Sequence, residues 1–159
     1  MITKDFLLEC GEYIKSGGIL SGAVFTPVDI PTHEFVDPSE AEAYLKKNRD
    51  VFFVQQLLGL IDKSGKKDSD VYKKAGIDRR LFSKIRSNLE YTPAKKTVIA
   101  LCLALELPRT DADLLLSSAG YSLSRADDFD LAIAFCIEKR VYDFLQINEV
   151  LDHFGFEVF

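Results

Sequence analysis

The sequence of 159 residues predicts an all-α fold: a helix-turn-helix bundle with an irregular N-terminal extension and a C-terminal helical pair. From residue 51 to residue 120, apolar side chains recur at intervals of three and four, and no strand-type alternation of useful length appears. Hydrophobic residues make up 47% of the chain and charged residues 28%. Such a chain can bury a core, so disorder along its whole length is excluded.

The first fifty residues are expected to form an N-terminal extension. An amphipathic helix is predicted over residues 5–15, followed by a Ser-Gly-Gly sequence that stops it. Residues 19–35 contain glycine and two prolines among apolar side chains, which predicts an extended segment with one or two short strands. A polar helix is expected over residues 40–47, with Pro38 in its first turn.

Residues 51–120 are expected to form the helical bundle. The first bundle helix is apolar on more than one face, so we expect the N-terminal segment or a second subunit to cover part of it. The sequence Thr-Asp-Ala-Asp at residues 110–113 indicates a capping box that opens the last helix, which ends at Gly120. The helices predicted before the capping box span residues 51–62, 68–75, 78–87 and 94–106.

The C-terminal residues 121–159 are expected to form a helical appendage. Ser124 and Asp127 indicate a cap before a helix over residues 129–138. A last helix is predicted over residues 146–154, closed by a glycine, and the phenylalanines of the final five residues are expected to pack against the protein.

Composition and motifs predict a cytoplasmic protein that is not an enzyme. The longest apolar stretch, residues 98–105, is too short to cross a bilayer, and the chain begins without a secretory signal. His33 lacks the second histidine of a zinc-protease helix, and His153 is expected to be structural. We therefore predict no metal, no cofactor and no catalytic residue. Three widely spaced cysteines, Cys10, Cys102 and Cys136, are expected to be buried reduced thiols.

Charge is distributed unevenly along the chain. The net charge is −5, but residues 61–97 contain eleven basic and five acidic side chains, a net charge of +6, which leaves −11 for the remainder. Attraction to phosphate falls off within roughly 8 to 10 Å at physiological ionic strength. A local basic face therefore matters more than the total charge, and a nucleic-acid partner is not excluded.

The most specific stretch lies at residues 68–88, where two short helices meet at Gly76. Glycine can adopt the left-handed conformation that ends a helix, Ile77 is expected to turn into the core, and Asp78 can cap the next helix. This arrangement predicts a helix-turn-helix. In its second helix, Leu81 or Phe82 and Ile85 are expected inside, and the side chains expected to face solvent are Arg79, Arg80, Ser83, Arg86 and Ser87.

Residues 51–119 resemble the Cro/repressor-type (XRE) helix-turn-helix family. The match consists of residues 76–78, of the hydrophobe-Ser-basic-hydrophobe sequence at residues 82–85, and of Pro93 with the apolar helix at 98–105. The chain has Asp68 where the family usually has glutamine and Tyr72 where it usually has alanine. The resemblance implies a bundle of about five helices whose third helix enters the major groove of DNA, in a transcriptional regulator of bacterial or phage origin.

The same resemblance implies which residues contact duplex DNA. Arg79, Arg80 and Ser83 would face base edges. The phosphate contacts would come from Lys73, Lys74, Lys84, Arg86, Ser87, Lys95 and Lys96. A homodimer is expected because one helix makes few contacts, with an interface from residues 51–61 and the C-terminal phenylalanines. The alternative is a protein-interaction or accessory module on the same bundle, for example in a bacterial effector or defence system.

Overall fold

The computed structural model describes residues 2–17, 37–49 and 51–159. In these ranges the chain forms helices and no strand, which confirms the all-α fold. The extended segment predicted over residues 19–35, with His33, lies outside the described residues. The described helices are α1 (Lys4–Lys15), α2 (Pro38–Asn48), α3 (Phe53–Ser64), α4 (Asp68–Lys74), α5 (Arg79–Ser87), α6 (Lys95–Ala104), α7 (Arg109–Ser118), α8 (Asp128–Glu138) and α9 (Phe144–His153).

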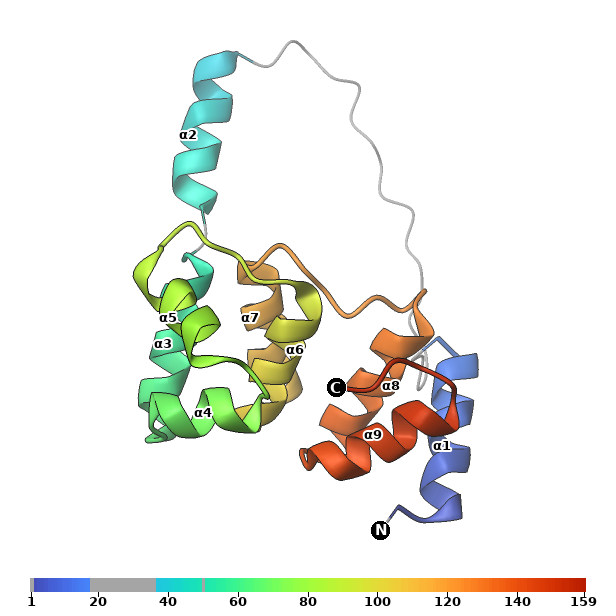
Figure 1. Ribbon diagram of the computed structural model, residues 1–159. Helices are drawn as coiled ribbons and strands as arrows, with labels where there is room; N and C mark the ends of the chain where they lie inside the picture. The colour runs from blue at the N-terminus through green and yellow to red at the C-terminus, as the bar shows by residue number, and fades with distance from the viewer. Residues whose placement is uncertain (1, 18–36, 50) are drawn as a thin grey trace.

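The helices form two packed groups and one separate helix (Figure 1). Helices α3 to α7 make up the first group, in which α3 packs on α7, and α6 packs on both α4 and α7. The second group joins the two ends of the sequence, because α1 packs on α8, which also contacts α9. The ring of Phe6 lies 5.0 Å from that of Phe135 across the α1 and α8 contact. Helix α2 stands apart from both groups.

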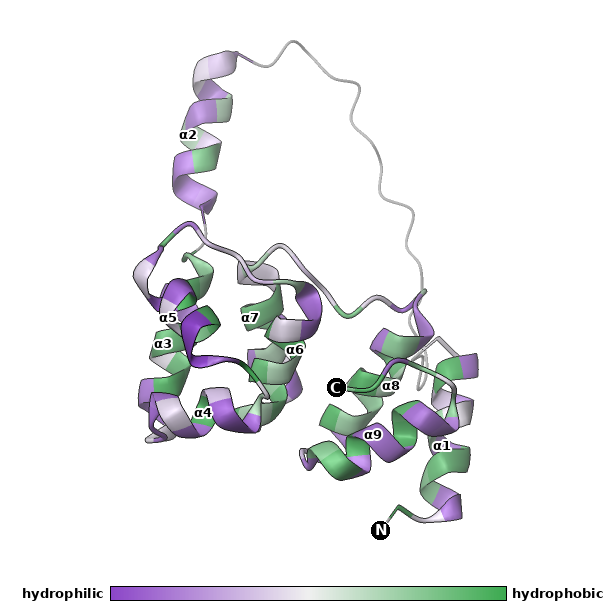
Figure 2. Ribbon diagram, viewed as in Figure 1, coloured by the Kyte–Doolittle hydropathy of each residue, from purple (hydrophilic) through white to green (hydrophobic). Residues whose placement is uncertain are grey.

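Hydrophobic residues concentrate on the helices at the centre of each group. Figure 2 shows α6 and α8 as mainly hydrophobic, whereas the visible part of α5 is hydrophilic. Every residue from Val98 to Leu105 is buried, as is every residue from Asp130 to Ile137. These two helices therefore lie at the centre of the core, and the helices around them add their buried faces to it.

Helix α3 is covered by the chain itself. Its buried side chains include Phe53, Leu57 and Ile61, which face the bundle. Among the described residues α7 packs on α3, and the N-terminal helix α1 packs on α8 instead. Cover of α3 by a second subunit stays a prediction.

Helix α7 begins earlier than predicted. It starts at Arg109, and Pro108 occupies the N-cap position without a side-chain hydrogen bond. The predicted capping box at residues 110–113 is therefore wrong. The reason is a competing partner, since the carboxylate of Asp113 accepts a hydrogen bond from the Arg109 Nε, 2.9 Å away, one turn earlier on the same helix.

The C-terminal residues pack as expected. After α9, Gly155 adopts a left-handed φ of 72°, and the chain turns back toward α8. The ring of Phe159 lies 5.5 Å from that of Phe144, and the ring of Phe156 lies 6.4 Å from that of Phe129. These contacts fix residues 155–159, the C-terminal tail, against the second group.

Candidate nucleic-acid interface

The turn between α4 and α5 has the geometry that the sequence predicts. Gly76 has a left-handed φ of 67°. Its N–H donates to the Lys73 carbonyl at 3.1 Å, and the Ile77 N–H donates to the Tyr72 carbonyl at 2.8 Å. These bonds satisfy the last carbonyls of α4, and Ile77 is buried. The turn therefore ends α4 and directs the chain into α5.

Helix α5 is fixed at its start and along its inner face. The Asp78 carboxylate caps it by accepting a hydrogen bond from the Arg80 N–H at 3.3 Å. Phe82 and Ile85 are buried, and the ring of Phe82 lies 5.4 Å from that of Tyr72 on α4. Tyr72 thus fills the space between α4 and α5 with a half-buried ring. The opposite face of α5 is left to solvent.

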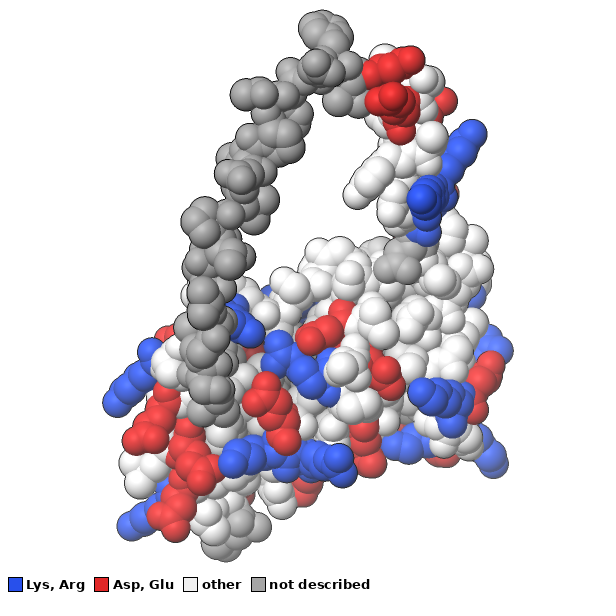
Figure 3. Space-filling view, turned by 180° about the vertical axis from the view of Figure 1, so that it is seen from behind, with Lys and Arg blue, Asp and Glu red and all other residues white. Residues whose placement is uncertain are grey.

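The exposed face of α5 carries cations in its first turn. Arg79, Arg80 and Ser83 are all exposed, as predicted, and Lys73 on α4 is exposed beside the turn. Among the residues that the structure describes, neither arginine nor Lys73 forms an ion pair or a side-chain hydrogen bond. Their donors are therefore available to an external partner. Around the α1 and α8 half, by contrast, acidic and basic side chains are interspersed (Figure 3).

Four other predicted phosphate contacts lie near α5 and already have partners. The Lys74 ammonium donates to the Glu106 carboxylate at 2.5 Å. Lys84 lies over the ring of Tyr91, 4.3 Å from its centroid. Arg86 pairs with Asp68, and Ser87 donates from its hydroxyl to the Lys84 carbonyl at 3.4 Å. These contacts are at the surface, so an added phosphate competes with weak interactions.

The pairing of Lys74 lowers the pKa of its partner. The hydrogen bond from Lys74 holds the pKa of Glu106 below its ordinary value. Glu106 also lies 3.8 Å from the Lys66 ammonium. This carboxylate therefore stays charged at neutral pH between two cations, and it reduces the positive potential at that end of α4.

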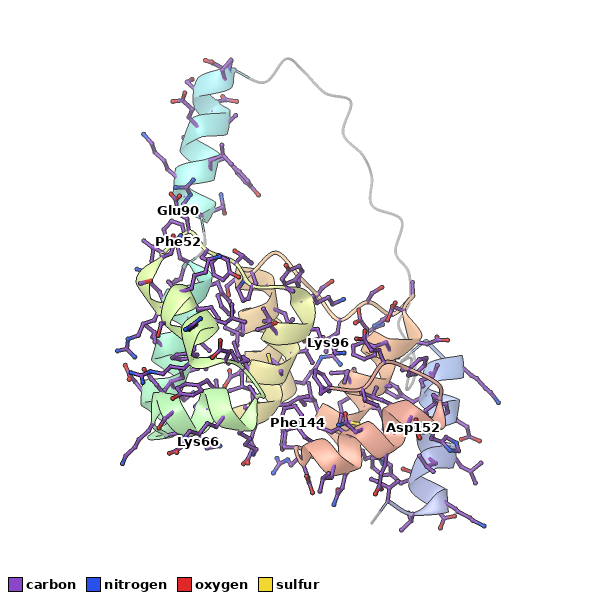
Figure 4. All side chains as sticks on the ribbon, in the orientation of Figure 1. Phe52, Lys66, Glu90, Lys96, Phe144 and Asp152 are labelled. Atoms are coloured by element: carbon purple, nitrogen blue, oxygen red, sulfur yellow. The ribbon has the colours of Figure 1, made fainter. Side chains whose placement is uncertain are left out.

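Lys95 and Lys96 at the start of α6 bind the C-terminal part of the chain. The Lys95 ammonium lies 2.5 Å from the carboxylate of Asp130, which is only 2% exposed. The Lys96 ammonium donates to the Val158 carbonyl at 2.7 Å and lies 3.1 Å from the Glu157 carboxylate. Figure 4 shows Lys96 between α6 and the second group. Both lysines, predicted to contact phosphates, are thus bound to groups of the same chain.

Lys67 is a candidate that the prediction did not include. It occupies the N-cap position of α4, is exposed, and forms no ion pair or side-chain hydrogen bond among the described residues. Its only signal in the sequence is membership of the basic segment at residues 61–97. It adds a further exposed cation at the start of α4.

The described residues contain neither a metal site nor a membrane-spanning helix. They contain no cluster of three His, Cys, Asp or Glu side chains that could hold a metal ion. None of the described helices is both long and apolar enough to span a membrane. Searches of protein-family models, of curated proteins and of solved structures found no match to this chain.

Proposed function

We propose that this protein binds duplex DNA through α5, as a transcriptional regulator. Arg79, Arg80 and Ser83 contact base edges, and Lys73 and Lys67 contact phosphates. The single observation that carries this proposal is a pair of exposed arginines in the first turn of the second helix of a helix-turn-helix, neither of which is paired with a described residue. Arginine donates two parallel hydrogen bonds to guanine in the major groove, and the turn at Gly76 directs α5 outward.

The contacts that each predicted phosphate-binding residue makes within the chain support a smaller proposed set. Lys84 and Ser87 remain in the proposed set, because a ring face and a long hydrogen bond hold them only weakly. To bind a phosphate, Lys74 would have to release the Glu106 carboxylate, and Arg86 would have to release that of Asp68. Lys95 and Lys96 are left out, because their donors are used to hold the C-terminal part of the chain.

The test compares DNA binding by the parent with that of the Arg79→Ala, Arg80→Ala double variant. The probe is a pool of duplexes with a randomised centre, titrated at several salt concentrations. We expect the double variant to bind at least about tenfold more weakly, since each bidentate arginine is worth about 1 to 3 kcal/mol. The affinity of the parent should fall linearly with log salt, with a slope of about −0.9 per phosphate contact.

The matched control is the Lys4→Ala, Lys15→Ala variant, which removes the same number of positive charges from α1. Both lysines are exposed, and α1 lies in the other group from α5. This control should bind DNA like the parent. Parental affinity in the double arginine variant, or no binding by the parent at low salt, would show that α5 does not read DNA.

A specific observation favours the second candidate, a protein-interaction module. Lys74, Arg86, Lys95 and Lys96, four of the seven predicted phosphate contacts, are already paired with acids of the same chain, and the net charge of the protein is −5. The tail residue Phe159 packs on Phe144, so it is a poor anchor for a partner protein. Leu145 on α9 is 76% exposed and is the better residue for the test. A stoichiometric complex that survives moderate salt and is lost on Leu145→Asp would favour this candidate.

A further inference from the structure

Helix α2 has no packing partner among the described residues. It spans eleven residues, and none of its side chains is buried. Figure 1 shows it standing away from both packed groups. A helix shorter than about 12 to 15 residues is only marginally stable in water, because helix nucleation is costly. A regular α2 therefore implies a surface that packs on it.

One face of α2 is suited to packing. Tyr44 and Leu45 lie three and four residues after Ala41, and Asn48 lies four and three residues after them, so the four residues share one side of the helix. Tyr44 is 68% exposed and Leu45 is 66% exposed. A tyrosine and a leucine side by side at the middle of a short helix form a compact apolar patch, flanked by charged residues.

The charges of α2 are segregated along its length. Asp37, Glu40 and Glu42 lie at its start, and Lys46, Lys47 and Arg49 lie at its end. Figure 3 shows the acidic side chains at the outer end of α2 and the basic ones nearer the bundle. Two such helices side by side in the same direction would place like charges together. In opposite directions, each acidic end lies beside a basic end.

We propose that α2 is a dimerisation helix, whose occupant is α2 of a second copy of this chain, packed antiparallel. A two-fold axis near Tyr44 and Leu45 places the two apolar patches face to face. In this arrangement Glu40 of one copy lies near Lys47 and Arg49 of the other. The helix is about 16 Å long, so the interface is at the small end of the known range and the dimer depends on concentration.

This proposal goes beyond DNA binding and does not rest on it. The interface expected from the sequence, residues 51–61 with the C-terminal phenylalanines, is largely used inside the chain. Helix α2 joins the bundle at the end where Figure 4 shows Phe52 and Glu90.

The experiment is sedimentation equilibrium of the full chain with two charge-reversed variants. The first carries Glu40→Lys and Glu42→Lys, and the second carries Lys46→Glu and Lys47→Glu. In each variant alone, the charged side chains within α2 all have the same sign, so like charges meet in the dimer. We therefore expect its dimerisation to weaken by about tenfold or more relative to the parent. An equimolar mixture of the two variants should dimerise again, because a basic helix then meets an acidic one.

The control carries Lys4→Glu and Lys15→Glu on α1, which changes the charge as much as the second variant does, and it should dimerise like the parent. A parent that stays monomeric at every concentration overturns the proposal. Helix α2 would then pack on a different protein or on the bundle of its own chain. Dimers that are insensitive to both reversals, or a mixture that fails to recover, overturn it as well. Since no DNA is present, these outcomes are separate from those of the α5 test.

Discussion

Burial sets the chemistry of the three cysteine side chains. Cys10, Cys102 and Cys136 are buried and free, as the sequence predicts. Burial raises the pKa of Cys10 to about 11 and the pKa values of Cys102 and Cys136 to about 12. At pH 8, about one Cys10 thiol in a thousand is then ionised, so all three should be poor nucleophiles.

We therefore predict that the folded protein does not react with a disulfide reagent at pH 8, whereas the unfolded chain reacts at three thiols. The measurement is the absorbance of the released thiolate, with and without guanidinium. A Ser117→Cys variant, at an exposed position on α7, serves as the positive control and should gain one fast thiol. Fast reaction of the folded parent would show that a native cysteine is accessible.

The raised thiol pKa values also predict a loss of stability at alkaline pH. The unfolded chain has thiol pKa values near the ordinary value of 9.0, so it loses protons before the folded chain does. The free energy of unfolding should therefore be unaffected by these thiols below pH 9 and should fall as the pH rises toward 11 and 12. Substituting Cys136 by alanine should remove part of this slope.

At the scale of one element, Asp78 has two opposing effects on α5. Its carboxylate caps the helix, and its negative charge lies next to Arg79 and Arg80. We predict that Asp78→Ala lowers the free energy of unfolding by about 1 kcal/mol, because the cap is lost. The same variant should bind DNA a few times more tightly, because an acidic neighbour of the two arginines is removed.

Asp78→Asn separates the two effects. Asparagine caps a helix about as well as aspartate, so stability should change by about 0.5 kcal/mol or less. The gain in DNA affinity should remain. Urea unfolding and the DNA titration measure the two quantities. If both variants bound DNA no better than the parent, the first turn of α5 would not lie close to the DNA.

The elements themselves could be predicted from local signals. Gly76 and Asp78 lie within a few residues of the helices that they end and begin, so their roles follow from one stretch of sequence. The partners of Lys95 and Lys96 could not be predicted in this way. They lie 35 and 62 residues further along the chain, and only the packing of the two groups brings them together.

At the scale of the whole molecule, two neighbouring lysines join the two packed groups in different ways. Lys95 meets the buried carboxylate of Asp130, which also accepts the Ser124 N–H at 2.8 Å. Lys96 meets Glu157, whose side chain is 86% exposed. A buried carboxylate that loses its cation is costly, whereas an exposed one is solvated by water.

We predict that Lys95→Met lowers the free energy of unfolding by about 2 to 3 kcal/mol. Lys96→Met, the matched variant one residue away, should lower it by about 1 kcal/mol or less. Methionine keeps most of the apolar length of lysine, so the difference reports the charge. Urea unfolding followed by circular dichroism provides both values. Equal losses in the two variants would mean that the carboxylate of Asp130 does not depend on Lys95.

The ion pair between Asp68 and Arg86 closes the open end of the V that α4 and α5 form. The turn at Gly76 fixes one end of this V, and the ion pair spans the other. Added salt weakens a surface ion pair as well as phosphate contacts. The angle between α4 and α5 is thus less restrained at high ionic strength. The slope of DNA affinity against log salt would then include the weakening of the Asp68–Arg86 ion pair as well as the loss of phosphate contacts.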